Sequence, residues 1–468
     1  MTATDEQRLA SWIEANIGGR VVRVEHLQRW RPGWNIDLEI DGAVLALHAR
    51  GDRELNFAIP CRIAGEVPIH DMLEVNGLPV PHAYGLCDDP YSLVMDRLRG
   101  DVDLTFAASD DERTQLIEEY LSMLPKIYGI SGDDLARAGF AVPTTAEGVA
   151  LDSFGRFEKV HDELMEVRDP VAEFLRRWLH HNYPHDRDQA TFVTYDAFQF
   201  MFEHGRITGL LDFELACVGD PMMDLAALRV RDTIKNLGDL SLIAHGFEVA
   251  TGMTVDHDAV DYHSVMYNTL TVLSAAPPIV SPIRTTDYVS HCAWYVNSAR
   301  WAFADIAEMR GFTLDTVAVP ASKPSRHGPS YTHLATALKA RSAEAPDDYE
   351  VASLYRHARH LRRVDEIGAA LLAADLDDLA ALLGRRVDAA HMDLALLDFI
   401  DGSGEDEAES LVKLLDRRVQ RMHLLLAPTG SLLLRHPPLR NLRHDVEDRV
   451  DDSQRWPAGA IPGTRSIG

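Results

Sequence analysis

Hydrophobic and polar positions alternate in short runs over the first hundred residues, which is the pattern of half-buried β-strands. The turn pair Asp41-Gly42 separates two of these runs, and a longer stretch with helical spacing follows the third. The expected elements are strands at Arg20–Leu27, Ile36–Ile40, Ala43–Ala49 and Tyr91–Leu98, with a helix at Asn56–Val75. We therefore expect residues 1–98 to form a small α+β unit.

The pattern from Asp103 onward is mainly helical, with one β-rich island. Helical spacing covers Thr114–Ile130 and Pro170–His181, and it resumes from Met223 to about Met309. The expected strands of the island are Ala190–Thr194, Phe198–Glu203 and Ile207–Asp212. This pattern predicts a second unit over residues 99–316 that is helical apart from the island.

The last third of the chain has a different pattern. Residues 317–329 are rich in Pro, Ser and small side chains, which predicts a linker. Residues 330–443 read as almost wholly helical, with amphipathic stretches at Ile367–Leu383 and Ala408–Leu426. We expect a separate C-terminal helical domain or a helical appendage there. Residues 444–468 hold charges, Gly and Pro with few large apolar groups, which predicts a disordered tail.

Composition excludes several classes of protein. The 468-residue chain has a formal net charge of −27, which argues against binding to nucleic acid or anionic membranes. It lacks the long apolar run of a membrane span, and its first residues lack the pattern of a signal peptide. The four cysteines are scattered without ligand spacing, so neither disulfides nor a zinc site are predicted. The cytoplasm is the expected compartment.

Two aspartates in the β-rich island suggest chemistry. Asp196 follows one apolar strand and Asp212 ends another, with a hairpin strand between them. Phosphoryl transfer uses such a pair, because one carboxylate orients and deprotonates the attacking hydroxyl while the other holds the magnesium on the nucleotide phosphates. Gln199 offers a further oxygen for the metal. The alternative is that Asp196 is a turn residue and Asp212 a surface strand end.

The surrounding residues carry a resemblance to a known family. Gly205–Ala216, followed by Gly219-Asp220-Pro221 and then Asp224-Leu225-Ala226, resembles the aminoglycoside phosphotransferase and choline kinase family. The resemblance spans roughly residues 15–312 and implies a two-lobed kinase-like fold that uses ATP and Mg²⁺. It also implies that Asp212 binds the metal, that Asp220 caps a helix and that Asp224 braces the catalytic loop.

The N-terminal unit also resembles this family, through residues 77–89 and 92–100. The likeness implies that backbone groups near Asp96 and Leu98 meet the adenine. It further implies that Glu66 pairs with a basic residue that grips the phosphates. Arg50 and His48 both qualify, because they lie two residues apart on one strand and face the same side; Arg50 is the better phosphate partner, being always charged.

The sequence departs from the family at three places. Thr194-Tyr195-Asp196 stands where the family has His-Gly-Asp, and Met201 occupies the place of the family's metal-binding Asn. Gln199 is the nearest substitute, since magnesium prefers oxygen to sulfur. The expected phosphate-covering loop, residues 29–35, has one glycine, two arginines and two tryptophans. Two hypotheses follow: an active kinase, or a pseudokinase that serves as a nucleotide-binding or scaffold protein.

Aromatic residues of the second unit bear on the acceptor. Most of them are expected in the core, and any that line the acceptor pocket would give it an apolar wall; the set is Tyr262, Tyr267, Trp294, Tyr295 and Trp301. Such a wall would favour a small hydroxylated acceptor with apolar surface over an aminoglycoside. The resemblance of residues 212–216 to the acyl-CoA-linked branch of the family points to a hydroxyacyl-CoA. A homodimer contact or a protein partner through the C-terminal helical domain is a further expectation.

Overall fold

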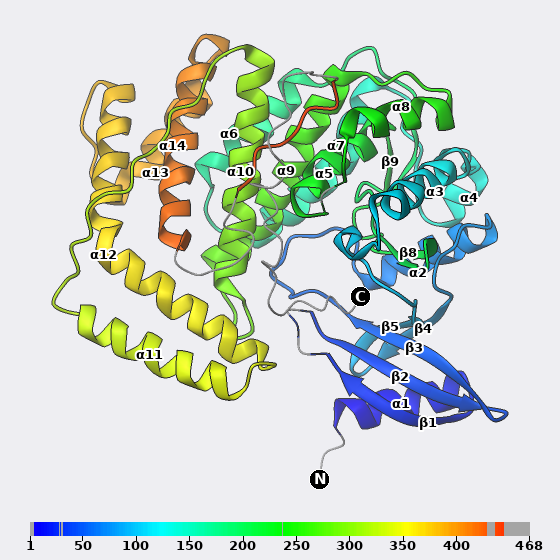
Figure 1. Cartoon of the computed structure of the whole chain (residues 1–468). Coiled ribbons are helices and arrows are strands. Elements are labelled where there is room, and N and C mark those ends of the chain that lie inside the picture. Colours follow the sequence, from blue (N-terminus) through cyan, green and yellow to red (C-terminus); the bar gives the residue numbers. More distant parts are fainter. Residues whose placement is uncertain (1–3, 28, 30, 236, 428–435, 444–468) are drawn as a thin grey trace.

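The computed structural model describes residues 4–27, 29, 31–235, 237–427 and 436–443. They form a small sheet-containing N-lobe and a larger helical C-lobe, seen in blue and in cyan to orange in Figure 1. This two-lobed α+β arrangement is the kinase-like architecture that the sequence predicted. None of the described helices is long and apolar enough to cross a membrane.

The N-lobe is an antiparallel sheet with the strand order β1-β2-β3-β5-β4. Its strands are β1 (Arg20–His26), β2 (Gly33–Ile40), β3 (Ala43–Gly51), β4 (Ala83–Asp88) and β5 (Tyr91–Asp96). Helix α1 (Asp5–Asn16) buries Leu9 and Ile13 against Trp34 and Ile36 of the sheet. This separate hydrophobic cluster makes the N-lobe a firm support for residues on β3.

Helix α2 (Ile63–Val75) lies between β3 and β4 in the chain and starts seven residues later than the sequence suggested. Pro60 disfavours helical backbone at the residue before it, and Arg62 is extended, with φ −82° and ψ 165°. The helix then continues through Pro68. Glu66 lies in its first turn and is fully buried, so its carboxylate faces the sheet rather than solvent.

The connection between the lobes depends on close backbone approach. After β5 the chain reaches Gly100 with φ +96°, and Asp101 then forms an isolated bridge with Phe202 of the C-lobe. A Cβ atom at Gly100 would lie 1.9 Å from the carbonyl oxygen of Phe202. Glycine is therefore required here both for its conformation and for the space.

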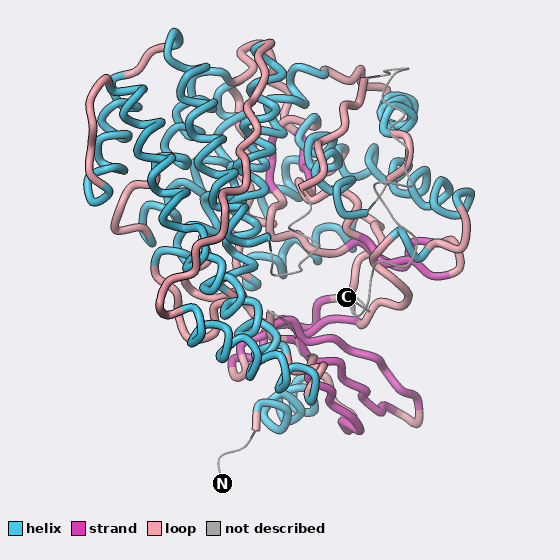
Figure 2. The backbone as a smooth tube through the Cα atoms, turned by 60° about the vertical axis from the view of Figure 1, so that its left-hand side comes forward, coloured by secondary structure: helices cyan, strands magenta, loops and turns pink. Residues whose placement is uncertain are grey.

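The C-lobe combines helices with two short hairpin-like sheets. Its helices are α3 (Asp110–Tyr128), α4 (Gly132–Arg137), α5 (Ala146–Leu164), α6 (Pro170–Asn182), α7 (Met222–Lys235), α8 (Leu240–Thr251), α9 (His257–Val280) and α10 (Tyr288–Arg310). Strand β6 (Thr191–Val193) pairs with β9 (Cys217–Gly219), and β7 (Phe200–Glu203) pairs with β8 (Arg206–Leu210). Figure 2 shows these short strands within the helical mass and the larger sheet apart from it.

The β7–β8 hairpin is shorter than the sequence suggested. The expected strands included Phe198 and Asp212, but both residues have positive φ, at +62° and +68°. A left-handed residue interrupts the extended backbone of a strand, so each strand stops short of it. The two candidate aspartates, Asp196 and Asp212, consequently lie on loops next to the hairpin rather than within strands.

The C-terminal helices are α11 (Gly328–Glu344), α12 (Tyr349–Leu383), α13 (Met392–Gly402) and α14 (Ala408–Leu426), in yellow and orange in Figure 1. The helical content of this region is as predicted. Helices α13 and α14 pack against α6 and α10, and their buried residues join the hydrophobic cluster of the C-lobe. Among the described residues this region therefore extends the C-lobe core, as an appendage does, and does not form a core of its own.

This shared core gives a testable prediction. Leu415 of α14 is fully buried, whereas Leu394 of α13 is 62% exposed. Leu415→Ala should lower the free energy of unfolding by about 2–5 kcal/mol through lost burial and a cavity, and Leu394→Ala should change it little. Chemical denaturation followed by fluorescence measures both. If α14 belonged to an independent domain, Leu415→Ala would instead shift a separate transition and leave the main one unchanged.

Candidate active site

Two cavities meet at Asp212, between the lobes. The first has a volume of about 540 Å³ and lies under the N-lobe sheet; its lining includes Arg29, Arg31, His48, Arg50, Met95, Asp96, Leu98, Met201 and Leu211. The second, of about 310 Å³, lies in the C-lobe; its lining includes Arg53, Phe57, Asp196, Gln199, Arg231, Tyr267, Trp294, Asn297 and Trp301. Asp212 lines both cavities, so it marks the point where ligands in the two spaces would touch.

Arg50 lies at the centre of the cleft. Its guanidinium forms ion pairs with Glu66 of α2 and with Asp212 of the C-lobe, and it lies 3.5 Å from Glu214. Burial alone would lower the pKa of Arg50, but these carboxylates raise it well above its usual range. Of the two basic residues left open by the sequence, Arg50 is therefore the one that pairs with Glu66.

His48 faces the same side of β3 as Arg50 but has other partners. Its Nδ1 lies 3.0 Å from the side-chain oxygen of Asn35, and its Nε2 lies 3.3 Å from a guanidinium nitrogen of Arg29. Burial, followed by the nearby positive charge of Arg29, lowers the pKa of His48 to about 3. His48 is thus a neutral wall of the first cavity and contributes no charge to it.

The loop before β2 adds buried positive charge. Arg31 lies 3.2 Å from Glu214 and donates a 2.9 Å hydrogen bond from Nε to the carbonyl of Gly51. Burial and the neighbouring Arg50 lower the pKa of both Arg29 and Arg31 to about 10. Arginines gathered in this way would be stabilised by an anion. Of the two tryptophans in the loop, Trp34 is a core residue, and Trp30 lies outside the described residues.

Asp224 holds the loop that carries Asp196. Its carboxylate accepts hydrogen bonds from the backbone N–H of Tyr195 at 2.8 Å, from the Thr194 hydroxyl at 3.1 Å and from the Tyr128 hydroxyl at 3.1 Å. The predicted bracing role is confirmed. Asp220 likewise accepts a 2.9 Å hydrogen bond from the N–H of Met222, the first residue of α7, as a helix cap would.

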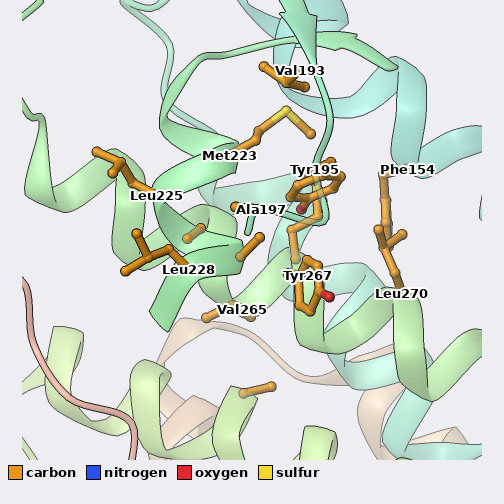
Figure 3. Packing of buried hydrophobic residues seen from close by; sticks show 14 of the residues in the cluster. Phe154, Val193, Tyr195, Ala197, Met223, Leu225, Leu228, Val265, Tyr267 and Leu270 are labelled. Atoms are coloured by element: carbon orange, nitrogen blue, oxygen red, sulfur yellow. The ribbon is translucent and has the colours of Figure 1, made fainter. Parts of the chain in front are cut away.

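Tyr195 replaces the expected glycine without filling the cleft. Its φ is +49°, a left-handed value that explains why glycine suits this position. Its ring is fully buried and meets Tyr267 edge to face, with centroids 5.5 Å apart (Figure 3). Tyr195 therefore adds no bulk beside the site, because its ring lies in the C-lobe core.

Asp196 is buried and held by two neighbours. Its two carboxylate oxygens pair with the guanidinium of Arg231 on α7, and one of them also accepts a 3.1 Å hydrogen bond from the Tyr267 hydroxyl. Burial raises the pKa of Asp196 and outweighs the lowering effect of Arg231. A hydroxyl that approached Asp196 would therefore have to compete with these two donors for its oxygens.

Gln199 lies between the two aspartates, and Lys235 fixes its orientation. The amide Nε2 is 3.2 Å from Asp196 Oδ2 and 3.5 Å from Asp212 Oδ2. The amide Oε1 accepts a 3.0 Å hydrogen bond from the buried amine of Lys235, which also donates to the carbonyl of Phe198 at 2.7 Å. Gln199 thus presents a nitrogen, not an oxygen, to Asp212.

The donor set does not fit the expected magnesium ion. Magnesium requires oxygen ligands, yet Asp212 is paired with Arg50, Asp196 with Arg231, and the Gln199 oxygen faces Lys235. Within the described residues no group of three or more His, Cys, Asp or Glu side chains could hold a metal ion. The expected role of Gln199 as a metal ligand has no support in this arrangement, and Oδ1 of Asp212 is already occupied by Arg50.

The two predicted adenine contacts differ in what they offer. Both Asp96 and Leu98 line the first cavity. The Asp96 N–H donates to the carbonyl of His82 at 3.0 Å, and its carboxylate accepts a 3.0 Å hydrogen bond from Tyr84. These groups of Asp96 therefore serve the N-lobe sheet. Leu98 follows the end of β5, so its backbone lies outside the strand ladder.

Sequence reasoning missed the cations that contact the loop of Asp196. Arg231 and Lys235 are four residues apart on α7, so they share one helix face. Their spacing directly after the Asp224-Leu225-Ala226 motif was the available signal. Glu214 was also missed; it is buried with Arg53, which donates to it at 2.9 Å, and with Arg31. Glu214 could not be recognised from sequence, because the arginines that flank it, Arg31 and Arg53, lie far from it along the chain.

A scan against protein families matches residues 60–247 to the phosphotransferase enzyme family. The matched segment contains Glu66, Asp196 and Asp212; it begins after β3 and ends within α8. This match is to the kind of family that the sequence resemblance indicated. No curated protein sequence gives a significant match to the chain.

Several solved structures resemble the chain over about two thirds of its length. A putative aminoglycoside phosphotransferase from Ralstonia eutropha is 16% identical, with a TM-score of 0.49 over 65% of this chain and 98% of that one. A thermostable mutant of an aminoglycoside phosphotransferase, in ternary complex with AMP-PNP and hygromycin B, is 13% identical, with a TM-score of 0.46 over 65% and 99%. A macrolide 2'-phosphotransferase from Brachybacterium faecium is 17% identical, with a TM-score of 0.41 over 62% and 96%. The family assignment rests on the sequence match.

The bracing aspartate gives a pH prediction. Burial raises the pKa of Asp224 from 3.8 to about 6. Between these values the folded chain retains a proton that the unfolded chain has lost, so the free energy of unfolding contributed by Asp224 falls as the pH rises through this window. Asp224→Asn lacks this titration. Denaturation curves at a series of pH values should therefore show the wild type losing stability relative to Asp224→Asn; parallel curves would contradict the assignment.

Proposed function

We propose that the chain is a nucleotide-dependent phosphotransferase that phosphorylates a hydroxyl group of a small molecule. The observation that carries this proposal is the meeting of two chemically different cavities at Asp212. In the proposed reaction, the bond between the γ-phosphorus and its bridging oxygen breaks and a bond to the acceptor oxygen forms. The hydroxyl proton passes to Asp196, and the nucleoside diphosphate leaves.

The first cavity supports nucleotide binding. One part of its wall is apolar, formed by residues such as Met95, Leu98 and Leu211, and suits a flat base. The other part carries the cluster of Arg29, Arg31 and Arg50, and guanidinium groups suit phosphate oxygens because they donate in pairs. ATP is the proposed donor. With its base against the apolar residues and its phosphates against the arginines, its γ-phosphate would lie toward Asp212.

The second cavity supports an acceptor with an apolar portion. Tyr267, Trp294 and Trp301, which the sequence suggested for such a pocket, contribute to its wall, whereas Tyr262 and Tyr295 are buried elsewhere. Polar groups of Asn297 and Ser298 also line it. A hydroxylated metabolite that is partly apolar, such as a hydroxyacyl thioester, fits this mixture better than a polycationic sugar does, because large apolar walls leave a hydrated cation without partners.

A second candidate function is nucleotide binding without phosphoryl transfer. The observation that favours it is the bidentate pairing of Asp196 with Arg231, reinforced by the Tyr267 hydroxyl. A carboxylate whose two oxygens are engaged in this way has no free oxygen aimed at an approaching hydroxyl. The chain would then act as a nucleotide-binding or scaffold protein, with partner contacts through the C-terminal helices.

Nucleotide binding is the first test. Titration calorimetry with a non-hydrolysable ATP analogue and its GTP counterpart should detect binding by the wild type. Arg50→Gln should lower the affinity for the preferred nucleotide at least about tenfold, because a buried charge-assisted contact to phosphate is lost. Arg20→Gln is the control, because Arg20 is an exposed arginine on β1 with 71% of its side chain accessible. Absence of nucleotide binding, or equal effects of the two variants, would refute the proposal.

Phosphoryl transfer is the second test, and it separates the two candidates. Fractions of a metabolite extract enriched in hydroxylated acyl compounds, incubated with ATP and protein, should yield a phosphorylated product detectable by mass spectrometry. Asp196→Asn should slow product formation by about 10²–10⁴-fold, the usual contribution of a positioned general base. Nucleotide binding with no product from any fraction would favour the non-catalytic candidate.

A further inference from the structure

The neighbours of Gln199 determine which way its amide points. Its Nε2 faces the carboxylates of Asp196 and Asp212, which can only accept hydrogen bonds while ionised. Its Oε1 faces the Lys235 amine, which donates to it at 3.0 Å. A flipped amide would set its NH₂ against the Lys235 amine and its oxygen against two carboxylates. The observed orientation therefore satisfies both sides, and the flipped one satisfies neither.

Arg231 and Lys235 bring two cations to this place from one helix. Both groups interact electrostatically with Asp196 and with Asp212, as does Arg50 with Asp212. Lys235 is only 6% exposed, and Arg231 lines the second cavity. When Lys235 is protonated, the pair supplies the charge of one divalent ion. An additional Mg²⁺ at Asp212 would then add positive charge beside Arg50, Arg231 and the protonated Lys235.

We propose that the transferred phosphoryl group is received by donors of the protein itself, namely Arg50, Arg231 and the Nε2 of Gln199, and that nucleotide binding needs no divalent metal ion. Lys235 is a positioning residue in this arrangement, because it acts by holding the amide of Gln199. The inference rests on the proposed nucleotide site. It differs from that proposal in assigning the neutralising charge to α7 instead of to magnesium.

The direct test is calorimetry of ATP binding to the full-length protein, with excess Mg²⁺ and again with EDTA. Affinities that agree within about threefold are expected, because the phosphates already meet cationic and N–H donors. Binding that is more than about tenfold tighter with Mg²⁺ would overturn the inference and leave the proposed function standing. Absence of binding under both conditions would overturn the proposed function, and the inference with it.

Variants of Lys235 test its positioning role through the dependence of ATP affinity on Mg²⁺, which would not change if Lys235 were purely structural. Lys235→Met removes the donor, so the Gln199 amide can turn its oxygen toward Asp212 and offer it to a metal. The ratio of ATP affinities with and without Mg²⁺ should then rise to about tenfold or more. Lys235→Arg keeps a donor for Gln199 and should restore a ratio near one.

A matched control uses a lysine outside the cleft. Lys126 of α3 also donates to a backbone carbonyl, that of Gly77, at 3.0 Å. Lys126→Met should leave the ratio of affinities as in the wild type. Thermal melts establish that each variant is folded. If Lys235→Met fails to fold, Gln199→Leu takes its place. The Gln199→Leu variant should weaken ATP binding equally with and without Mg²⁺. An unchanged ratio in folded Lys235→Met would show that Lys235 does not position the amide.

Discussion

Arg50 is a buried charge between the two lobes, and the organisation of the cleft depends on its pairing. Its carboxylate partners are Glu66 on α2 and both Asp212 and Glu214 on the loop after β8, so this side chain of β3 joins three parts of the chain. A buried charge is tolerated only when it is paired and hydrogen-bonded. The pairing therefore fixes the position of β3 relative to the C-lobe, and it sets the N-lobe cavity directly against Asp212.

The same requirement explains the unusual surroundings of Asp196. Its carboxylate is buried in the C-lobe, and α7 supplies Arg231 to neutralise it and Lys235 to complete the hydrogen bonds of Gln199. The C-lobe core then holds the loop through the inward ring of Tyr195 and the bonds to Asp224. Both aspartates of the proposed reaction thus lie at the cleft. The side chains of Arg50, Arg231 and Lys235 occupy the positions around them where a metal ion was expected.

Much of this arrangement could be predicted from sequence, because it depends on local patterns. The alternation of apolar residues located the strands, and the motif from Gly205 to Ala226 identified the family segment and the bracing role of Asp224. Boundaries were less accurate where a single residue set the backbone, as with Pro60 before α2 and the positive φ of Phe198. The shared core of α14 and the C-lobe could not be predicted, because amphipathic spacing shows that a face is buried but not what covers it.

The sequence by itself determined the kinase-like fold class and the match of residues 60–247 to the phosphotransferase enzyme family, with Asp196 and Asp212 close to one cleft. Only the tertiary structure decided that Arg50 rather than His48 pairs with Glu66, and that Arg231 holds Asp196. It also decided that Gln199 presents nitrogen to Asp212. The physical reason is that local spacing fixes which face a side chain occupies, whereas hydrogen-bond and charge partners are set by elements that meet only when the lobes and α7 pack together.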